Sequence, residues 1–211
     1  YPSPKTACRS WNLHACMTKE QARKLYLQKR TSLTDAEFKK LNQKICDQFF
    51  SSLDLSFIKV LHSFLPIEKQ KEVNTWLILD RVKKELPEIR IAIPRINNQT
   101  SVLESYYLED MDQLERNTWG IMEPSRGVPA PESQIDAVLV PLLAVDRKGN
   151  RVGYGRGFYD RFLTKVNGKK IGLSFFPPVK EIVDMNSQDV PIDVVVTPDG
   201  ILSTEGKKSS T

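Results

Sequence analysis

The stretch from Gly149 to Asp160 reads G-N-R-V-G-Y-G-R-G-F-Y-D, and it follows a β-branched run at Ile135–Val140. The run predicts a buried strand, and open α/β sheets place their ligands beyond the carboxyl ends of such strands. Alternating glycines let the backbone approach a ligand closely and direct its N–H groups towards it. Two interleaved arginines add positive charge. The stretch therefore predicts a site for a polyphosphate.

A helix is predicted directly after the glycines, over residues 158–166. Its N-terminus would add the positive end of a helix dipole to the same site. Asp160 lies in the first turn, and Mg²⁺ is usually held by one or two carboxylates together with phosphate oxygens. Two plainer readings are that this acid only balances the dipole and that the glycines form a flexible turn. The stretch lacks the G-K-[ST] ending of a Walker A loop, and it lacks the later acid of a dinucleotide-binding fold.

Four residues elsewhere in the chain could complete such a site. Asp189 precedes the last predicted strand and could supply a second carboxylate, although alone it also fits a turn. Lys19 and Arg23 lie one helical turn apart and could clamp a phosphate, although such a pair often forms a solvated basic face. Trp119 could stack on a planar heterocycle or fill a core.

Helix and strand patterns alternate along most of the chain. Thr18-x-x-Gln21 and Thr34-x-x-Glu37 are capping boxes, and each predicts the start of a helix. The predicted helices cover 19–30, a stretch that begins at 35, 72–86 and 158–166. The predicted strands cover 57–65, 89–93, 101–108, 135–140, 170–175 and 193–197. A helical turn is expected at 110–114 and a loop at 120–131. Such alternation predicts a single three-layer α/β domain with a mainly parallel sheet and helices on both faces.

The composition is that of an ordinary globular protein, with 211 residues, 40% hydrophobic and 27% charged. No apolar run reaches the length of about 18 residues that a membrane-spanning helix needs. The net charge of +5 suits anionic partners such as nucleotides. An equally good interpretation is that this charge only keeps the protein soluble. Three irregularly spaced cysteines and two histidines argue against a disulfide framework or a zinc cluster, so we expect a reducing, cytoplasmic location.

The first sixteen residues differ from the rest of the chain, because they contain no acid and show no clear periodicity. Met17 reads like a natural start of translation, so we interpret residues 1–16 as an upstream or cloning-derived extension. A transit peptide is the alternative interpretation. We predict one domain over 17–204 and a disordered tail over 205–211.

Taken in order, these motifs resemble the 5-formyltetrahydrofolate cyclo-ligase family over about 17–200. The most specific part is D-R-K-G-N-R-V-G-Y-G-R-G-F-Y-D-R-F-L, from Asp146 to Leu163. The supporting motifs are K-x-x-x-R at 19–23, R-x-x-L at 30–33, E-V-N-T at 72–75, I-P-R at 93–95, W-G-I-x-E-P at 119–124 and D-V-P-I-D-V-V-V-T at 189–197.

The resemblance implies a reaction that uses ATP and Mg²⁺. In this family 5-formyltetrahydrofolate becomes 5,10-methenyltetrahydrofolate, with release of ADP and phosphate, through a phosphorylated formyl oxygen and attack by N10. The implied partner is the folate, with or without a polyglutamate tail, rather than nucleic acid or a membrane, and we expect a monomer. The alternative is a basic nucleotide- or nucleic-acid-binding module without catalysis, although the charges are dispersed along the chain.

Matched position by position, the resemblance also implies site residues. The catalytic candidates are Arg151, Arg156 and Tyr159. The ATP-binding candidates are Lys19, Arg23, Arg151, Val152, Gly153, Tyr154, Gly155, Arg156, Gly157, Phe158 and Tyr159. The substrate-binding candidates are Leu65, Glu72, Trp119, Tyr154, Gly155, Arg156, Gly157 and Phe158, and the magnesium candidates are Asp160 and Asp189. The loop between Leu65 and Glu72 is slightly longer than the family spacing leads us to expect.

Overall fold

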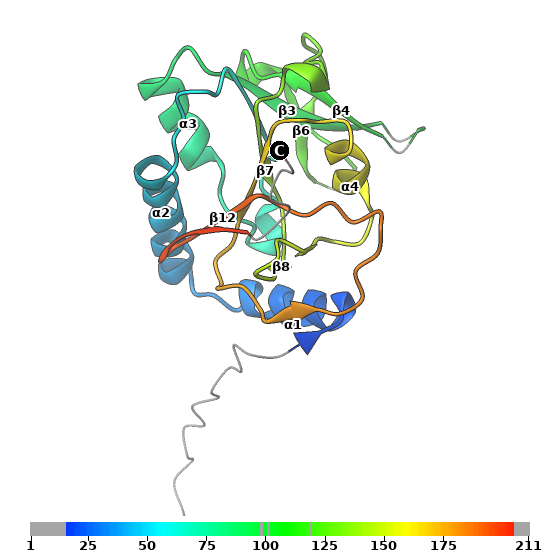
Figure 1. Cartoon of the computed structure of the whole chain (residues 1–211). Coiled ribbons are helices and arrows are strands. Elements are labelled where there is room, and N and C mark those ends of the chain that lie inside the picture. Colours follow the sequence, from blue (N-terminus) through cyan, green and yellow to red (C-terminus); the bar gives the residue numbers. More distant parts are fainter. Residues whose placement is uncertain (1–15, 98, 101, 119, 205–211) are drawn as a thin grey trace, which may run out of the picture.

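The structure is a computed structural model that describes residues 16–97, 99–100, 102–118 and 120–204 (Figure 1). Residues 1–15 of the expected extension, the expected tail over 205–211 and Trp119 lie outside the described residues. Cys16 is described, and with Met17 it forms β1 (Cys16–Met17), which pairs in parallel with β11 (Glu181–Ile182).

A seven-stranded sheet forms the centre of the molecule, in the order β13-β12-β10-β7-β2-β3-β4. Its strands are β2 (Val60–Ser63), β3 (Arg90–Asn97), β4 (Val102–Tyr107), β7 (Ala137–Val140), β10 (Lys169–Leu173), β12 (Val194–Thr197) and β13 (Gly200–Ser203). The five inner strands run in parallel, and β4 and β13 pair antiparallel at the two edges. Every strand that the sequence predicts is present, whereas β13 was not predicted. The mainly parallel α/β sheet is confirmed, and the single three-layer domain stays a prediction.

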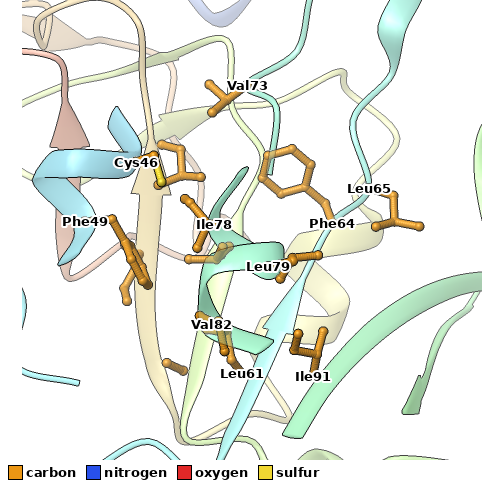
Figure 2. Close-up of a cluster of buried hydrophobic side chains, with 14 of the residues drawn as sticks. Cys46, Phe49, Leu61, Phe64, Leu65, Val73, Ile78, Leu79, Val82 and Ile91 are labelled. Carbon is orange, nitrogen blue, oxygen red and sulfur yellow. The ribbon is translucent and has the colours of Figure 1, made fainter. Parts of the chain in front are cut away.

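Alternate residues of the sheet belong to two separate hydrophobic clusters, as the period of a strand requires. In β7, Ala137 and Leu139 belong to a cluster with side chains from α2 (Asp35–Ser52) and α3 (Trp76–Glu85), part of which Figure 2 shows. Val138 and Val140 belong to a second cluster, which includes side chains from α4 (Phe158–Leu163). Figure 1 shows α2 and α3 on one side of the sheet and α4 on the other.

Both predicted capping boxes are confirmed. The Thr18 side chain accepts from the N–H of Gln21 at the start of α1 (Lys19–Thr31), and Thr34 and Glu37 make the equivalent pair at the start of α2. No helix among the described residues is long and apolar enough to cross a membrane.

The predicted helix over 72–86 begins later than expected, at Trp76. A short 3₁₀ turn, η1 (Glu68–Gln70), and Lys71, whose φ is +45°, form a loop before it. The Glu72 carboxylate accepts from the N–H of Ile67 over 2.8 Å and closes this loop. Glu72 therefore lies on a loop that its own side chain holds, and the helical prediction was wrong for residues 72–75.

Two small hairpins were not expected. The chain between β7 and the glycines forms β8 (Ala144–Val145) and β9 (Arg151–Val152), so the glycine loop leaves β9 and not the buried strand β7. The predicted loop at 120–131 contains β6 (Met122–Pro124), which pairs with β5 (Leu114–Arg116).

The helical turn expected at 110–114 is confirmed as η2 (Met111–Gln113). The helix predicted over 158–166 is confirmed as α4, which ends three residues earlier, at Leu163.

Candidate functional site

A cavity of about 560 Å³ lies beyond the carboxyl ends of β2 and β7, where a parallel sheet is expected to place its ligand. Residues from most parts of the chain line it: Lys19, Arg23, Phe64, Leu65, Ile67, Gln70, Glu72, Pro94, Ile96, Leu103, Ile121, Met122, Glu123, Pro141, Arg151 to Asp160 and Asp189. Every predicted site residue that the structure describes is in this set. The structure thus brings the N-terminal basic pair, the glycine loop and both acids to one cavity.

The glycine loop and α1 form the cationic part of the cavity lining. Arg23 donates from Nε to the carbonyl oxygen of Gly153 over 2.9 Å, which ties α1 to the loop. Gly155 has a φ of +90° and Gly157 a φ of +66°, a region that side chains disfavour. A Cβ atom on Gly155 would also lie 3.3 Å from the Arg23 guanidinium. The glycines are therefore required by backbone shape and by the close approach of a cation.

The two predicted metal carboxylates face this cationic region, and each is held through one oxygen. Asp160 accepts from Arg151 Nη2 over 2.7 Å and from the N–H of Val190 over 3.2 Å, both at Oδ1. Asp189 accepts from Lys19 Nζ over 2.5 Å and from the N–H of Asn186 over 2.7 Å, both at Oδ2. In the described part of the chain, the second oxygen of each carboxylate receives no hydrogen bond.

This arrangement fits a magnesium ion that completes its shell with phosphate oxygens and water. The described residues contain no group of three or more acidic, histidine or cysteine side chains that could form a metal cage by themselves. A site that the protein shares with phosphate needs only one or two carboxylates, each with an oxygen that accepts no hydrogen bond from the protein. Asp160 and Asp189 are thus suitable ligands, and their assignment stays a prediction.

Arg151 is a buried cation at the base of the loop, with a side chain only 5% exposed. Burial lowers the pKa of this guanidinium, and the neighbouring charge of Asp160 opposes that effect. Its Nε is buried without a hydrogen-bond partner among the described residues. Because an unpaired buried donor is costly, this group is available to an anion in the cavity.

The remaining lining is largely apolar. It consists of the apolar residues Phe64, Leu65, Ile67, Pro94, Ile96, Leu103, Ile121, Met122 and Pro141, together with Gln70. Two carboxylates, Glu72 and Glu123, interrupt this surface. Glu123 accepts from Asn117 Nδ2 over 3.1 Å. Burial raises the pKa of Glu72, which also accepts from the hydroxyl of Tyr154 over 2.9 Å. An apolar lining with a few fixed polar groups suits a planar organic ligand with N–H donors.

Asp146 positions the glycine loop but was not among the predicted site residues. It is fully buried, and its carboxylate accepts from the backbone N–H groups of Lys148, Asn150 and Ile182. The sequence D-R-K-G-N carries the signal of an Asp-initiated turn, which could have revealed this role.

Arg30 was also missed. Its guanidinium is buried beneath the loop and donates to the Tyr154 hydroxyl. Glu123 was missed as well. The apolar lining residues, apart from Leu65, were missed because isolated hydrophobic residues give no local signal of a cavity.

The fold and the cavity define a ligand-binding α/β enzyme in which a cationic glycine loop adjoins an apolar chamber. The chain belongs to the 5-formyltetrahydrofolate cyclo-ligase family, whose model matches residues 15–198. The resemblance seen in the sequence is thus confirmed, and the relatives that carry this name are ligases.

Individual relatives cover nearly the whole chain. A probable 5-formyltetrahydrofolate cyclo-ligase of Schizosaccharomyces pombe is 28% identical over 204 residues, which are 88% of this chain and 98% of the relative. The NMR structure of Aquifex aeolicus 5,10-methenyltetrahydrofolate synthetase has a TM-score of 0.77 and 29% identity, and it covers 92% of this chain and 97% of its own. The fold is also similar to that of a 5,10-methenyltetrahydrofolate synthetase from Mycoplasma pneumoniae, with a TM-score of 0.64, 24% identity, and coverage of 86% and 99% of the two chains.

Proposed function

We propose that the protein converts 5-formyltetrahydrofolate to 5,10-methenyltetrahydrofolate in a reaction that requires ATP and Mg²⁺. One observation carries the proposal: a single cavity contains both a cationic glycine loop and an apolar chamber with a buried carboxylate. The loop suits the phosphates of ATP and the chamber suits a pteridine. A reaction between the two ligands needs this adjacency, because the reacting atoms must be held in contact.

The chemistry follows from the poor leaving ability of an amide oxygen. The formyl oxygen attacks the γ-phosphorus of ATP, and ADP leaves. N10 of the folate then attacks the activated formyl carbon and loses its proton, and phosphate departs with the former formyl oxygen. The ring closes to the methenyl cation, so that one ATP gives one ADP and one phosphate.

The chain's own residues act in this scheme by position and charge. Arg151 and Arg156 line the cavity and stabilise the negative charge of the transferring phosphoryl group. Lys19 and Arg23 hold the remaining phosphates from α1, and Tyr159 positions the reacting groups from the start of α4. Asp160 and Asp189 would bind Mg²⁺, which when bound neutralises phosphate charge and orients the phosphates.

The direct test is an absorbance assay for the methenyl product, with purified protein, ATP, Mg²⁺ and 5-formyltetrahydrofolate. We expect product and ADP to form in equal amounts, and both to require Mg²⁺. Absence of both would contradict the proposal. An ATP-independent, salt-sensitive affinity for single-stranded nucleic acid would instead favour the basic binding module.

The predicted monomer, the cytoplasmic location and the polyglutamate tail of the substrate stay predictions. Size-exclusion chromatography with light scattering tests the first. Competition between mono- and polyglutamylated folates tests the last.

A further inference from the structure

We infer that Arg30 is a positioning residue of the folate end of the cavity: through the Tyr154 hydroxyl it holds Glu72 as a charged carboxylate that accepts hydrogen bonds from the substrate. This inference rests on the proposed function, because it takes the ligand of the apolar chamber to be a reduced pteridine. It concerns a residue that contributes no atom to the cavity lining.

Arg30 joins three segments that each contribute to the cavity. Its side chain projects from the C-terminal turn of α1, and the residue is only 3% exposed. Nε donates to the carbonyl oxygen of Gln70 over 2.7 Å, and Nη1 donates to that of Leu142 over 3.4 Å. Nη2 donates to the hydroxyl of Tyr154. All three guanidinium nitrogens are thus engaged, one with each segment, as the planar fork of arginine allows.

The Tyr154 hydroxyl connects this guanidinium to the carboxylate. It accepts from Arg30 and donates to Glu72 Oε1 over 2.9 Å. The N–H of Ile67 donates to the other oxygen, Oε2, over 2.8 Å. Each oxygen of a carboxylate can accept about two hydrogen bonds, so each retains capacity for a donor in the cavity. A reduced pteridine carries N–H and amino donors of the required kind.

The charge of Arg30 opposes the effect of burial on Glu72. Burial raises the pKa of this carboxyl group, and Arg30 is the cation that lowers it. The other titratable groups that face it are Tyr154, from the glycine loop, and Tyr159, from α4. Burial raises the pKa of both phenols, so they stay neutral at physiological pH and supply no charge. The hydrogen bonds that Glu72 accepts from the Ile67 N–H and the Tyr154 hydroxyl also lower its pKa, but Arg30 is the largest of the effects that oppose burial.

The protonation state of Glu72 decides what it offers to a ligand. As a carboxylate it accepts from N–H groups, whereas a protonated carboxyl group presents a donor in place of one acceptor. If Arg30 were neutralised, the pKa of Glu72 would rise further, and the protonated form would persist to a higher pH than in the unaltered protein. Folate binding would then become weaker towards acid pH.

The experiment measures the Kd of 5-formyltetrahydrofolate without ATP, by calorimetry, across the neutral pH range. Arg30→Met is compared with Lys24→Met, which removes a positive charge from an exposed position of the same helix. We expect the Kd to have the same pH profile in the unaltered protein and in Lys24→Met. In Arg30→Met the Kd should rise about tenfold per pH unit below the raised pKa. A profile parallel to that of the unaltered protein would overturn the inference.

Two further variants keep the test decisive if Arg30→Met does not fold. Arg30→Lys retains the charge but not the fork, so its pH profile should return to that of the unaltered protein, with a uniformly weaker Kd. Tyr154→Phe removes the hydroxyl and should weaken binding most at acid pH. Equal weakening at every pH in Tyr154→Phe, or an acid-sensitive Kd in Arg30→Lys, would contradict the inference.

Failure of the inference can be told apart from failure of the proposed function. The unaltered protein must bind 5-formyltetrahydrofolate and form the methenyl product for the proposed function to hold. If it does so while the Arg30 variants show no change in pH profile, only the role of Arg30 is rejected.

Discussion

Arg151 donates to Asp160 over 2.7 Å, and this pair joins the strand before the glycine loop to the first turn of the helix after it. The Arg151 side chain is 5% exposed and that of Asp160 is 23% exposed, so water screens the pair only in part. The pair therefore places a cation and an acid side by side at the turn where we propose that phosphate and Mg²⁺ bind.

Asp160→Asn tests the metal assignment. The amide keeps the shape of the side chain but removes the charge that attracts a cation, and Oδ1 is already committed to Arg151 and Val190. We expect turnover to fall and the Mg²⁺ concentration for half-maximal activity to rise by on the order of 10- to 100-fold. Asp199→Asn, at an exposed position between β12 and β13, is the matched control. Unchanged magnesium dependence in Asp160→Asn would refute the assignment.

Lys19→Met tests the N-terminal phosphate contact. Lys19 lines the cavity from the first turn of α1 and is held by Asp189 over 2.5 Å. Loss of one charge-assisted hydrogen bond to phosphate should raise the KM for ATP about tenfold, with little change in the Kd of the folate. Lys24→Met, on the exposed side of the same helix, should leave both constants unchanged. Steady-state kinetics with each substrate varied in turn separates these outcomes.

Gly155→Ala tests the shape of the loop. The residue has a φ of +90°, and an added Cβ would lie 3.3 Å from the Arg23 guanidinium. We expect kcat/KM for ATP to fall by about tenfold or more, and the free energy of unfolding to fall by about 1–2 kcal/mol. Gly200→Ala is the control, because its φ of +145° is also strained but its Cβ would meet no atom within 4 Å. The control should lose stability and keep its activity. Equal activities in Gly155→Ala and Gly200→Ala would contradict the proposal that the shape of the glycine loop is needed for the reaction with ATP.

His62→Leu tests the pH dependence of stability. His62 is fully buried beside Phe162, with neither ring nitrogen hydrogen-bonded in the described structure, and burial lowers its pKa from 6.5 to about 3. The unfolded chain binds this proton below pH 6.5 and the folded chain does not, so stability falls with the pH between 6.5 and about 3. This single group contributes a slope of at most about 1.4 kcal/mol per pH unit.

His62→Leu should therefore reduce the loss of unfolding free energy at acid pH, as measured by urea unfolding at several pH values. The substitution also removes two unpaired buried nitrogens, so its cost at neutral pH should be small. If the acid-induced loss is as steep in His62→Leu as in the unaltered protein, then His62 is not its source.

Features encoded within a few neighbouring residues were predictable from the sequence. Both capping boxes, the alternation of helices with parallel strands, and the succession of glycines and arginines from Arg151 to Gly157 depend on local spacing. The β8–β9 hairpin was missed because a strand of two residues has no period, and the edge strand β13 was missed because Gly200–Ser203 lacks the continuous apolar run that marks β7. The late start of α3 was missed because the bond from Ile67 to Glu72 competes with helix formation.

The sequence by itself determined which residue types could bind phosphate and a divalent cation, because glycine spacing and charge are local properties. Only the tertiary structure decided that Lys19, Glu72 and Asp189 line one cavity, since parallel strands bring distant segments to the same edge of the sheet. It also decided that Arg30, Tyr154 and Glu72 form one buried chain of hydrogen bonds. Their protonation depends on burial and on the charges around them, and both arise only when segments far apart in the sequence pack together.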